Sequence, residues 1–136
     1  MTVLADFNTI IPEDPQNIPV RQGQQSPLGT RFNAGGRLGE GSGQTGAHGA
    51  FIMFSVLNLL VPLDVFVNGE GPIGTMDPNP PGGAGWYSQV LCMSGGRLKS
   101  GDGLNNEISV TLPPASPVGT AAFMIKNLIC FYHQDS

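Results

Sequence analysis

The chain has 136 residues, of which 12% are charged, and its formal net charge is −4. Its six Lys and Arg residues are scattered, which argues against nucleic-acid binding, because that activity depends on clustered basic contacts to phosphate. Hydrophobic residues make up 40% of the chain, enough for one core, whereas 20 Gly and 12 Pro predict long irregular loops.

Residues 1–30 are predicted to form an extended N-terminal arm, and residues 31–136 a β-sandwich domain. Prolines recur through the arm, and each lacks a backbone N–H and disfavours helix in the residue before it. These prolines are Pro12, Pro15, Pro19 and Pro27. The apolar residues of the arm include Val3, Leu4, Phe7, Ile10 and Ile11. Such a segment gains order by packing, either on its own domain or on a neighbouring subunit.

After a glycine-rich loop at 33–49, five segments are predicted to be strands. They are residues 50–56, 59–67, 86–93, 107–112 and 120–132. In the second segment Leu63, Val65 and Val67 share one face, as the two-residue period of a strand requires. A buried helix over 50–60 is the alternative for the first segment, because periodicity does not distinguish a short buried helix from a buried strand.

The segments between these strands carry turn signals. Asn68-Gly69 is typical of a hairpin turn, and residues 69–85 are expected to form a long loop. Within 120–132 the inward-facing positions shift by one residue, which predicts a β-bulge near Lys126-Asn127.

Several strands separated by such turns predict an all-β fold. We expect an antiparallel β-sandwich, jelly-roll-like or immunoglobulin-like, with long Gly/Pro loops; a barrel is the alternative. We expect no membrane span over 50–67, because Asn58, Pro62 and Asp64 interrupt the apolar run. A central Asp alone costs about 3 kcal/mol on insertion.

No cluster in the sequence has the spacing of a catalytic or metal site, so we expect no enzyme activity, no cofactor and no metal. His48 and His133 are the two histidines, and neither stands in a G-x-S-x-G or H-E-x-x-H pattern. Residues 69–74 match G-x-G-x-x-G, but residues 75–78 cannot open the helix that would receive a pyrophosphate. Cys92 and Cys130 are expected to be buried thiols, with a disulfide as the alternative.

Trp86 and Tyr87 are the best candidates for ligand binding. They come directly after a glycine-rich stretch, and an aromatic pair beside a flexible loop can form a platform for a sugar ring. The competing interpretation places Trp86 in the core, where a loop enters a strand. We therefore expect no small-molecule ligand, and a carbohydrate-binding, lectin-like module is the alternative function.

In overall layout the chain resembles the small β-sandwich decoration or cement proteins of tailed-phage heads. The layout comprises the proline-rich arm, the low charge, the long loops and the small β core, and includes no specific motif. The resemblance implies a non-enzymatic structural protein on the capsid surface of a virion, a trimer or other oligomer. Its partners would be the major capsid protein and copies of itself.

On this hypothesis Val3, Leu4, Phe7, Ile10 and Ile11 are interface residues that clasp a neighbouring subunit. An interface of about 1,600 Å² suffices for specific association, and several such contacts strengthen one another. Deleting residues 1–16 is then expected to leave a folded domain that no longer assembles.

Overall fold

The computed structural model describes residues 3–34, 49–82, 85–93, 97–99 and 103–135; the side chains of 3–5 and 133–135 lie outside this description. Nine β-strands are found in the described part of the chain. They are β1 Val3–Ile11, β2 Gln16–Arg21, β3 Ser26–Pro27, β4 Ala50–Leu57, β5 Leu63–Val67, β6 Glu70–Met76, β7 Tyr87–Met93, β8 Ile108–Thr111 and β9 Thr120–Asp135.

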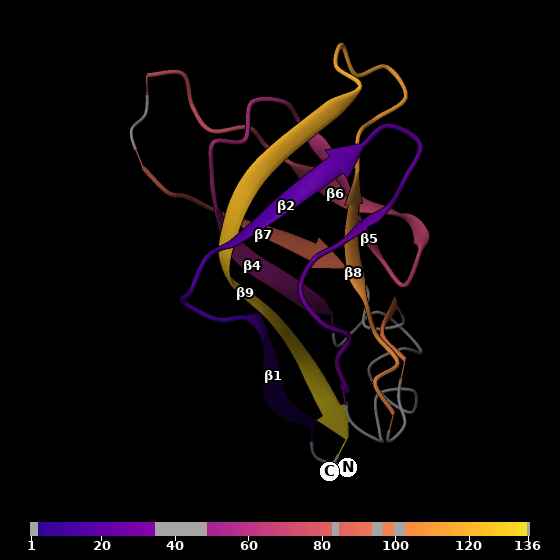
Figure 1. The fold of residues 1–136 in the computed structure, drawn as a ribbon. Helices are drawn as coiled ribbons and strands as arrows, with labels where there is room; N and C mark the ends of the chain where they lie inside the picture. The colour runs from indigo at the N-terminus through magenta and orange to yellow at the C-terminus, as the bar shows by residue number, and fades with distance from the viewer. Residues whose placement is uncertain (1–2, 35–48, 83–84, 94–96, 100–102, 136) are drawn as a thin grey trace.

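The strands form two antiparallel sheets that pack against each other (Figure 1). The five-stranded sheet has the order β1-β9-β4-β7, with β2 also paired to β9. The four-stranded sheet has the order β3-β8-β5-β6. The predicted all-β, antiparallel sandwich is therefore confirmed.

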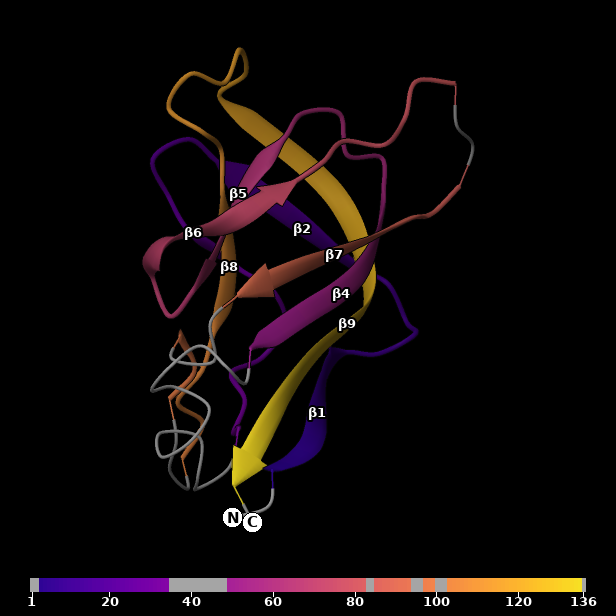
Figure 2. The ribbon, with the colours of Figure 1, turned by 180° about the vertical axis from the view of Figure 1, so that it is seen from behind.

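Strand β9 is the longest, and it runs the length of the sandwich with partners on both edges (Figures 1 and 2). Strand β4 lies on one edge, while β2 pairs with the first half of the other edge and β1 with the second half. The register with β4 slips by one residue between Lys126 and Ile129. Asn127, at the slip, has a φ of 54° and donates its backbone N–H to the Pro12 carbonyl, 3.0 Å away. The predicted bulge is confirmed.

Strand β5 shows the alternation that the sequence predicts. Leu63, Val65 and Val67 are fully buried, and Asp64 and Phe66 lie on the opposite face, half-buried. The strand is shorter than expected: it begins at Leu63, and the backbone N–H of Leu59 donates to Asn79 Oδ1 at 2.9 Å instead of to a neighbouring strand.

Strand β6 occupies residues that were expected to lie in a long loop. Asn68 and Gly69 have φ values of 58° and 72°, so they form the predicted tight turn, and this turn brings residues 70–76 back beside β5. The sequence of β6 hides the strand because it is rich in Gly and contains Pro72, so it has no apolar alternation. Residues 70–76 form a strand because the tight turn sets them in register with β5, so that the two segments pair through their backbones.

The core lies between the two sheets and contains side chains from both. On β4, Ile52, Phe54 and Val56 are buried, and the strand pairs with β7 and β9, so the helical alternative for 50–60 is wrong. The largest fully buried side chains are Phe54, Phe123, Ile11, Leu28, Ile52, Leu59, Leu63, Met76, Ile108, Ile125 and Leu128. In the described part of the chain, no helix is long and apolar enough to cross a membrane.

The N-terminal residues belong to the sandwich, which corrects the expected division into an arm at 1–30 and a domain at 31–136. Strands β1 and β2 pair with β9, and β3 pairs with β8. Ile18 and Val20 of β2 are buried in the core. Pro19 is compatible with β2 because an edge strand tolerates the loss of one N–H. The prolines therefore punctuate strands of the domain rather than mark a free arm.

Two asparagines fasten loops to one end of the four-stranded sheet. Asn106 is fully buried; its side-chain oxygen accepts bonds from the Lys99 backbone N–H at 2.7 Å and from Asn68 Nδ2 at 3.0 Å. Its own amide donates to the Lys99 carbonyl at 2.9 Å. Asn68 also donates to the Arg97 carbonyl at 2.9 Å. A buried amide satisfied in this way fixes the surrounding loops, whereas a hydrophobic replacement would leave several backbone groups unpaired.

Replacing Ile11 with Ala should destabilise the fold, although the residue lies in a segment whose sequence resembles a free arm. The lost burial and the resulting cavity predict a decrease of about 2–5 kcal/mol in the free energy of unfolding, measured by urea denaturation. Phe7→Ala on the same strand is the control; Phe7 is 57% exposed, so its loss should cost less than about 1 kcal/mol. Equal effects of the two substitutions would contradict the placement of β1.

Candidate interaction surface

The interface residues predicted from the sequence differ in their exposure to solvent. Phe7 points outward and is 57% exposed, whereas Ile10 and Ile11 are 6% and 0% exposed. The prediction that Ile10 and Ile11 contact a partner is wrong, because these side chains pack in the core of their own subunit. Gly29 makes this packing close: a Cβ there would lie 2.8 Å from Ile10 Cγ2. Val3 and Leu4 lie on β1, but their side chains are outside the described residues.

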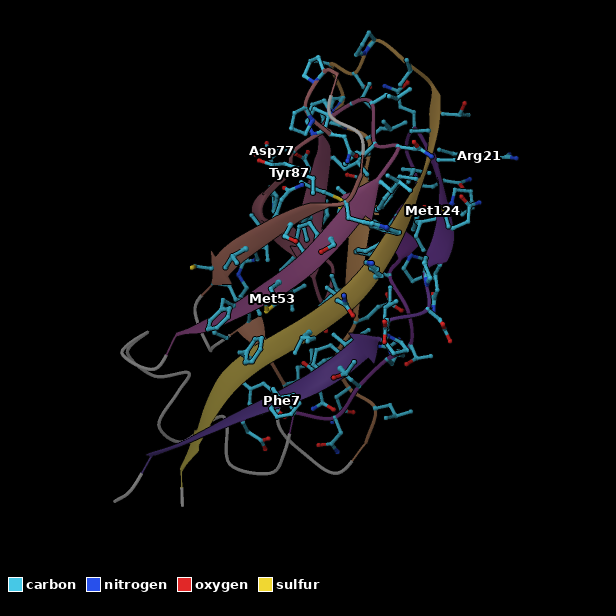
Figure 3. All side chains as sticks on the ribbon, turned by 90° about the vertical axis from the view of Figure 1, so that its left-hand side faces the viewer. Phe7, Arg21, Met53, Asp77, Tyr87 and Met124 are labelled. Carbon is cyan, nitrogen blue, oxygen red and sulfur yellow. The ribbon has the colours of Figure 1, made fainter. Side chains whose placement is uncertain are left out.

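The face of the five-stranded sheet that points away from the smaller sheet is largely apolar. Cross-strand pairing places Phe7 beside Phe131, Phe131 beside Phe51, and Met53 between Ile129 and Val90. We define the outer face as Phe7, Phe51, Met53, Trp86, Val90, Met124, Lys126, Ile129 and Phe131. Figure 3 looks onto this face and shows Phe7, Met53 and Met124 on three adjacent strands.

Three phenylalanines form a row across the outer face, one from each of three neighbouring strands. The rings of Phe51 and Phe131 are stacked, with centroids 4.7 Å apart and an interplanar angle of 16°. The ring of Phe7 is tilted against Phe131 at a centroid distance of 6.0 Å. Both geometries are favourable for aromatic pairs, so the row is held in place before any partner arrives. Phe51 is 36% exposed, Met53 37% and Val90 54%.

The outer face carries almost no charge. Lys126 is the one charged residue of the set, and its Nζ lies 4.4 Å from the centroid of the Trp86 ring. This cation–π contact gives the ammonium group a partner. Arg21, an exposed cation at the end of β2, lies on the same side of the five-stranded sheet but beyond this set. The hydroxyls of Ser55 and Ser88, which face each other across β4 and β7, are hydrogen-bonded at 2.8 Å. Covering this face would therefore bury few polar groups that lack a partner.

Trp86 and Tyr87 do not form a shared platform for a sugar. Tyr87 pairs with Val56 and packs against the core, whereas Trp86 contacts Lys126 on the outer face. Consecutive residues of a strand point to opposite faces, so the two rings diverge. Trp86 thus contributes to the outer face, and Tyr87 to the packing between the sheets.

The two cysteines differ in environment, and both are free thiols. Cys130 is buried as expected, and burial raises the pKa of its thiol from 9.0 to about 12. Cys92 is exposed, so the expectation that it is buried is wrong. It lies on β7 opposite Phe51, on the solvent side of the sheet.

The outer face could not be recognised from residues 50–56 alone, because these residues form an almost continuous apolar run without alternation. A continuous apolar run is typical of a strand covered on both faces. In this structure one face of β4 packs in the core and the other carries Phe51 and Met53 in partial contact with solvent. The signal was present in the sequence: a strand that is apolar on both faces, placed in a two-layer sandwich, implies an apolar face outside the core.

The described residues place no group of three or more His, Cys, Asp or Glu side chains where a metal ion could bind. His48 and the side chain of His133 lie outside the described residues. Searches for relatives are also negative: no protein-family model and no curated protein matches the chain.

The stability of the fold should decrease at alkaline pH. The folded state keeps the Cys130 thiol protonated, so its contribution is complete below pH 9 and is lost as the pH rises towards about 12. Burial, and then the charge of Asp6, also raises the pKa of Tyr132 to about 12, against a lowering by the hydrogen bond from Asn8. Urea denaturation at pH 8 and pH 11 should show the decrease, and Cys130→Ala should show a smaller one. An equal decrease in the variant would contradict this assignment.

Proposed function

We propose that this protein is a non-catalytic structural protein that associates with further copies of itself through the outer face. The observation that carries the proposal is the row of Phe7, Phe131 and Phe51, continued by Met53 and Val90, on a sheet face that nothing else in the described chain covers. Large apolar patches on soluble domains mark interaction sites.

A second copy of the chain fits the outer face better than a charged partner does. The one cation of the outer face is held over Trp86, and Arg21 lies beyond it at the end of β2, so two copies can meet through the row of phenylalanines without bringing like charges together. Two-fold self-association brings the same patch of both subunits together, so an apolar patch is complementary to itself. A partner with a charged surface would lose hydration here and gain no ion pair.

The size of the face predicts weak pairwise association. Four strands about 4.8 Å apart and about eight residues long at 3.4 Å per residue cover on the order of 500 Å². Stable interfaces bury about 800 Å² on each partner. One pair of outer faces therefore gives a weak dimer, and firm attachment needs several contacts made together.

This requirement suits a protein that works in a layer or shell. In overall layout the chain resembles the decoration and cement proteins of tailed-phage heads, and we propose the same setting: the capsid surface of a virion, with the major capsid protein as a second partner and trimers or other oligomers as the unit. The outer face replaces the N-terminal clasp as the attachment surface, and Phe7 is the residue common to both.

Lysine substitutions on the outer face should weaken self-association. Val90→Lys and Met53→Lys, on paired positions of β7 and β4, would place like charges against each other in the dimer. Sedimentation velocity over a concentration series should show the dimer of the wild type and a dissociation constant at least about 10-fold higher in each variant.

Leu60→Lys is the matched control, because Leu60 is an exposed apolar residue, 86% accessible, that lies outside the outer face. It should leave the dissociation constant unchanged, and thermal unfolding should verify that all three variants fold. Sulfate should strengthen association of the wild type, since it favours apolar burial. A wild type that stays monomeric at every concentration, or a control as disruptive as Val90→Lys, would contradict the proposal.

A further inference from the structure

A pocket lined by both apolar and polar side chains lies over the four-stranded sheet, on the side of the sandwich away from the outer face. The loop between β2 and β3 covers part of β5 and β8, and the space between them has a volume of about 560 Å³. Volumes of about 300–1,000 Å³ are usual for small-ligand sites. The residues that line it are Gln22, Gly23, Gln24, Gln25, Asp64, Phe66, Thr111, Leu112 and Pro114. Figures 1 and 2 show this loop on the same side of the molecule as β5 and β8.

The loop that forms the wall of the pocket is fastened at both ends. Gln22 donates its backbone N–H to the Gly119 carbonyl at 2.9 Å and its side-chain amide to the Pro114 carbonyl at 3.2 Å. At the other end, Ser109 donates to the Gln25 side-chain oxygen at 3.2 Å. The pocket is therefore formed before a ligand binds, which lowers the entropic cost of binding.

Other polar groups of the pocket have no partner within the described part of the chain. Asp64 and Thr111 are direct cross-strand neighbours on the outward side of β5 and β8, so their side chains are about 5 Å apart. Neither the Asp64 carboxylate, the Thr111 hydroxyl nor the Gln24 side-chain amide makes a hydrogen bond to another described residue. Phe66, two residues after Asp64 on the same face, adds a half-buried ring.

We propose that this pocket binds a neutral, polyhydroxylated ring of the saccharide class. A sugar presents hydroxyl groups that can donate to the Asp64 carboxylate and exchange hydrogen bonds with Thr111 and Gln24. It also presents an apolar face of C–H groups that packs on an aromatic ring, which Phe66 supplies. The pocket therefore offers a saccharide three hydrogen-bonding groups, namely one carboxylate, one hydroxyl and one amide, and one aromatic ring for its apolar face.

Other ligand classes match the pocket less well. A phosphorylated ligand would meet the negative charge of Asp64 and no cation, because no Lys or Arg lines the pocket. A calcium ion needs six to eight oxygen ligands, and one carboxylate supplies too few of them. An apolar ligand would bury the Asp64 carboxylate without a hydrogen bond, which is costly.

The inference is independent of self-association. The outer face belongs to the five-stranded sheet, whereas the pocket belongs to the four-stranded sheet, so a dimer through the outer face leaves the pocket open. The pocket also differs from the Trp86 and Tyr87 pair, whose rings point to opposite faces.

A monosaccharide panel, followed by titration in two-dimensional NMR, tests the proposal. The probes are glucose, galactose, mannose and N-acetylglucosamine, and the amide signals of residues 22–25 and of Asp64 and Thr111 should shift for at least one of them. Asp64→Asn keeps the shape but loses the charged acceptor, and it should weaken binding about 10-fold or more. Asp14→Asn, an exposed acid in the turn between β1 and β2, is the matched control and should bind as the wild type does.

Four results would overturn the proposal. The first is that no sugar of the panel shifts the pocket signals; the second is that Asp64→Asn binds as tightly as the wild type. The third is binding lost in Trp86→Ala but retained in Asp64→Asn, which would move the site to the outer face. The fourth uses butylammonium as a cationic probe: tighter binding of it than of any sugar would replace the saccharide class by an organic cation. Unchanged amide spectra away from the pocket verify that the variants fold.

Discussion

The structure depends on the backbone pairing of β9, which pairs with three other strands, β1, β2 and β4. Its 16 residues exceed the length that one partner strand covers, so β1 and β2 share one edge. The bulge at Asn127 separates these halves, and its N–H is bonded to Pro12 in the connection between β1 and β2. A bulge increases the local twist and bends a strand. The bulge thus lies where the pairing of β9 with β2 ends and its pairing with β1 begins. It also keeps the apolar side chains of β9 pointing into the core on both sides of Asn127.

The two outward-facing surfaces of the sandwich have different chemistry. The chemistry of each surface depends on the alternate residues of its strands, whose side chains point away from the core. The five-stranded sheet presents Phe51 and Met53 to solvent, while the four-stranded sheet presents Asp64 and Thr111. Apolar area favours protein contact, and uncommitted polar groups around a ring favour a small hydroxylated ligand. Subunits paired through the first surface would carry the second on their far sides. A coat built in this way could present many weak sugar sites at once, and multivalency would raise their combined affinity.

Sequence reasoning succeeded where local chemistry decides the conformation, as in the alternation of 63–67, the Asn68-Gly69 turn and the bulge near Lys126-Asn127. It failed where partners distant in sequence decide. Residues 70–76 are a strand because the turn places them beside β5, and Ile11 is buried because β9 passes next to it, neither of which periodicity reveals. The candidate surface shows the same division: Phe7, predicted as an interface residue, is exposed, while the neighbouring Phe131 and Phe51 could be found only from the pairing of three strands.

The pairing of Val3 with Asp135 places the two ends of the described chain side by side, at the same end of the sandwich (Figure 1). In an antiparallel pair held in this way, tension applied between the ends loads the hydrogen bonds of β1 and β9 one after another, as in opening a zipper, and not all together in shear. The domain is therefore mechanically weak along that axis, although its core is well packed. A lattice that must withstand internal pressure would have to transmit the load through the flat faces of the two sheets. The force would then act across the sandwich and would not pull apart the hydrogen bonds between β1 and β9.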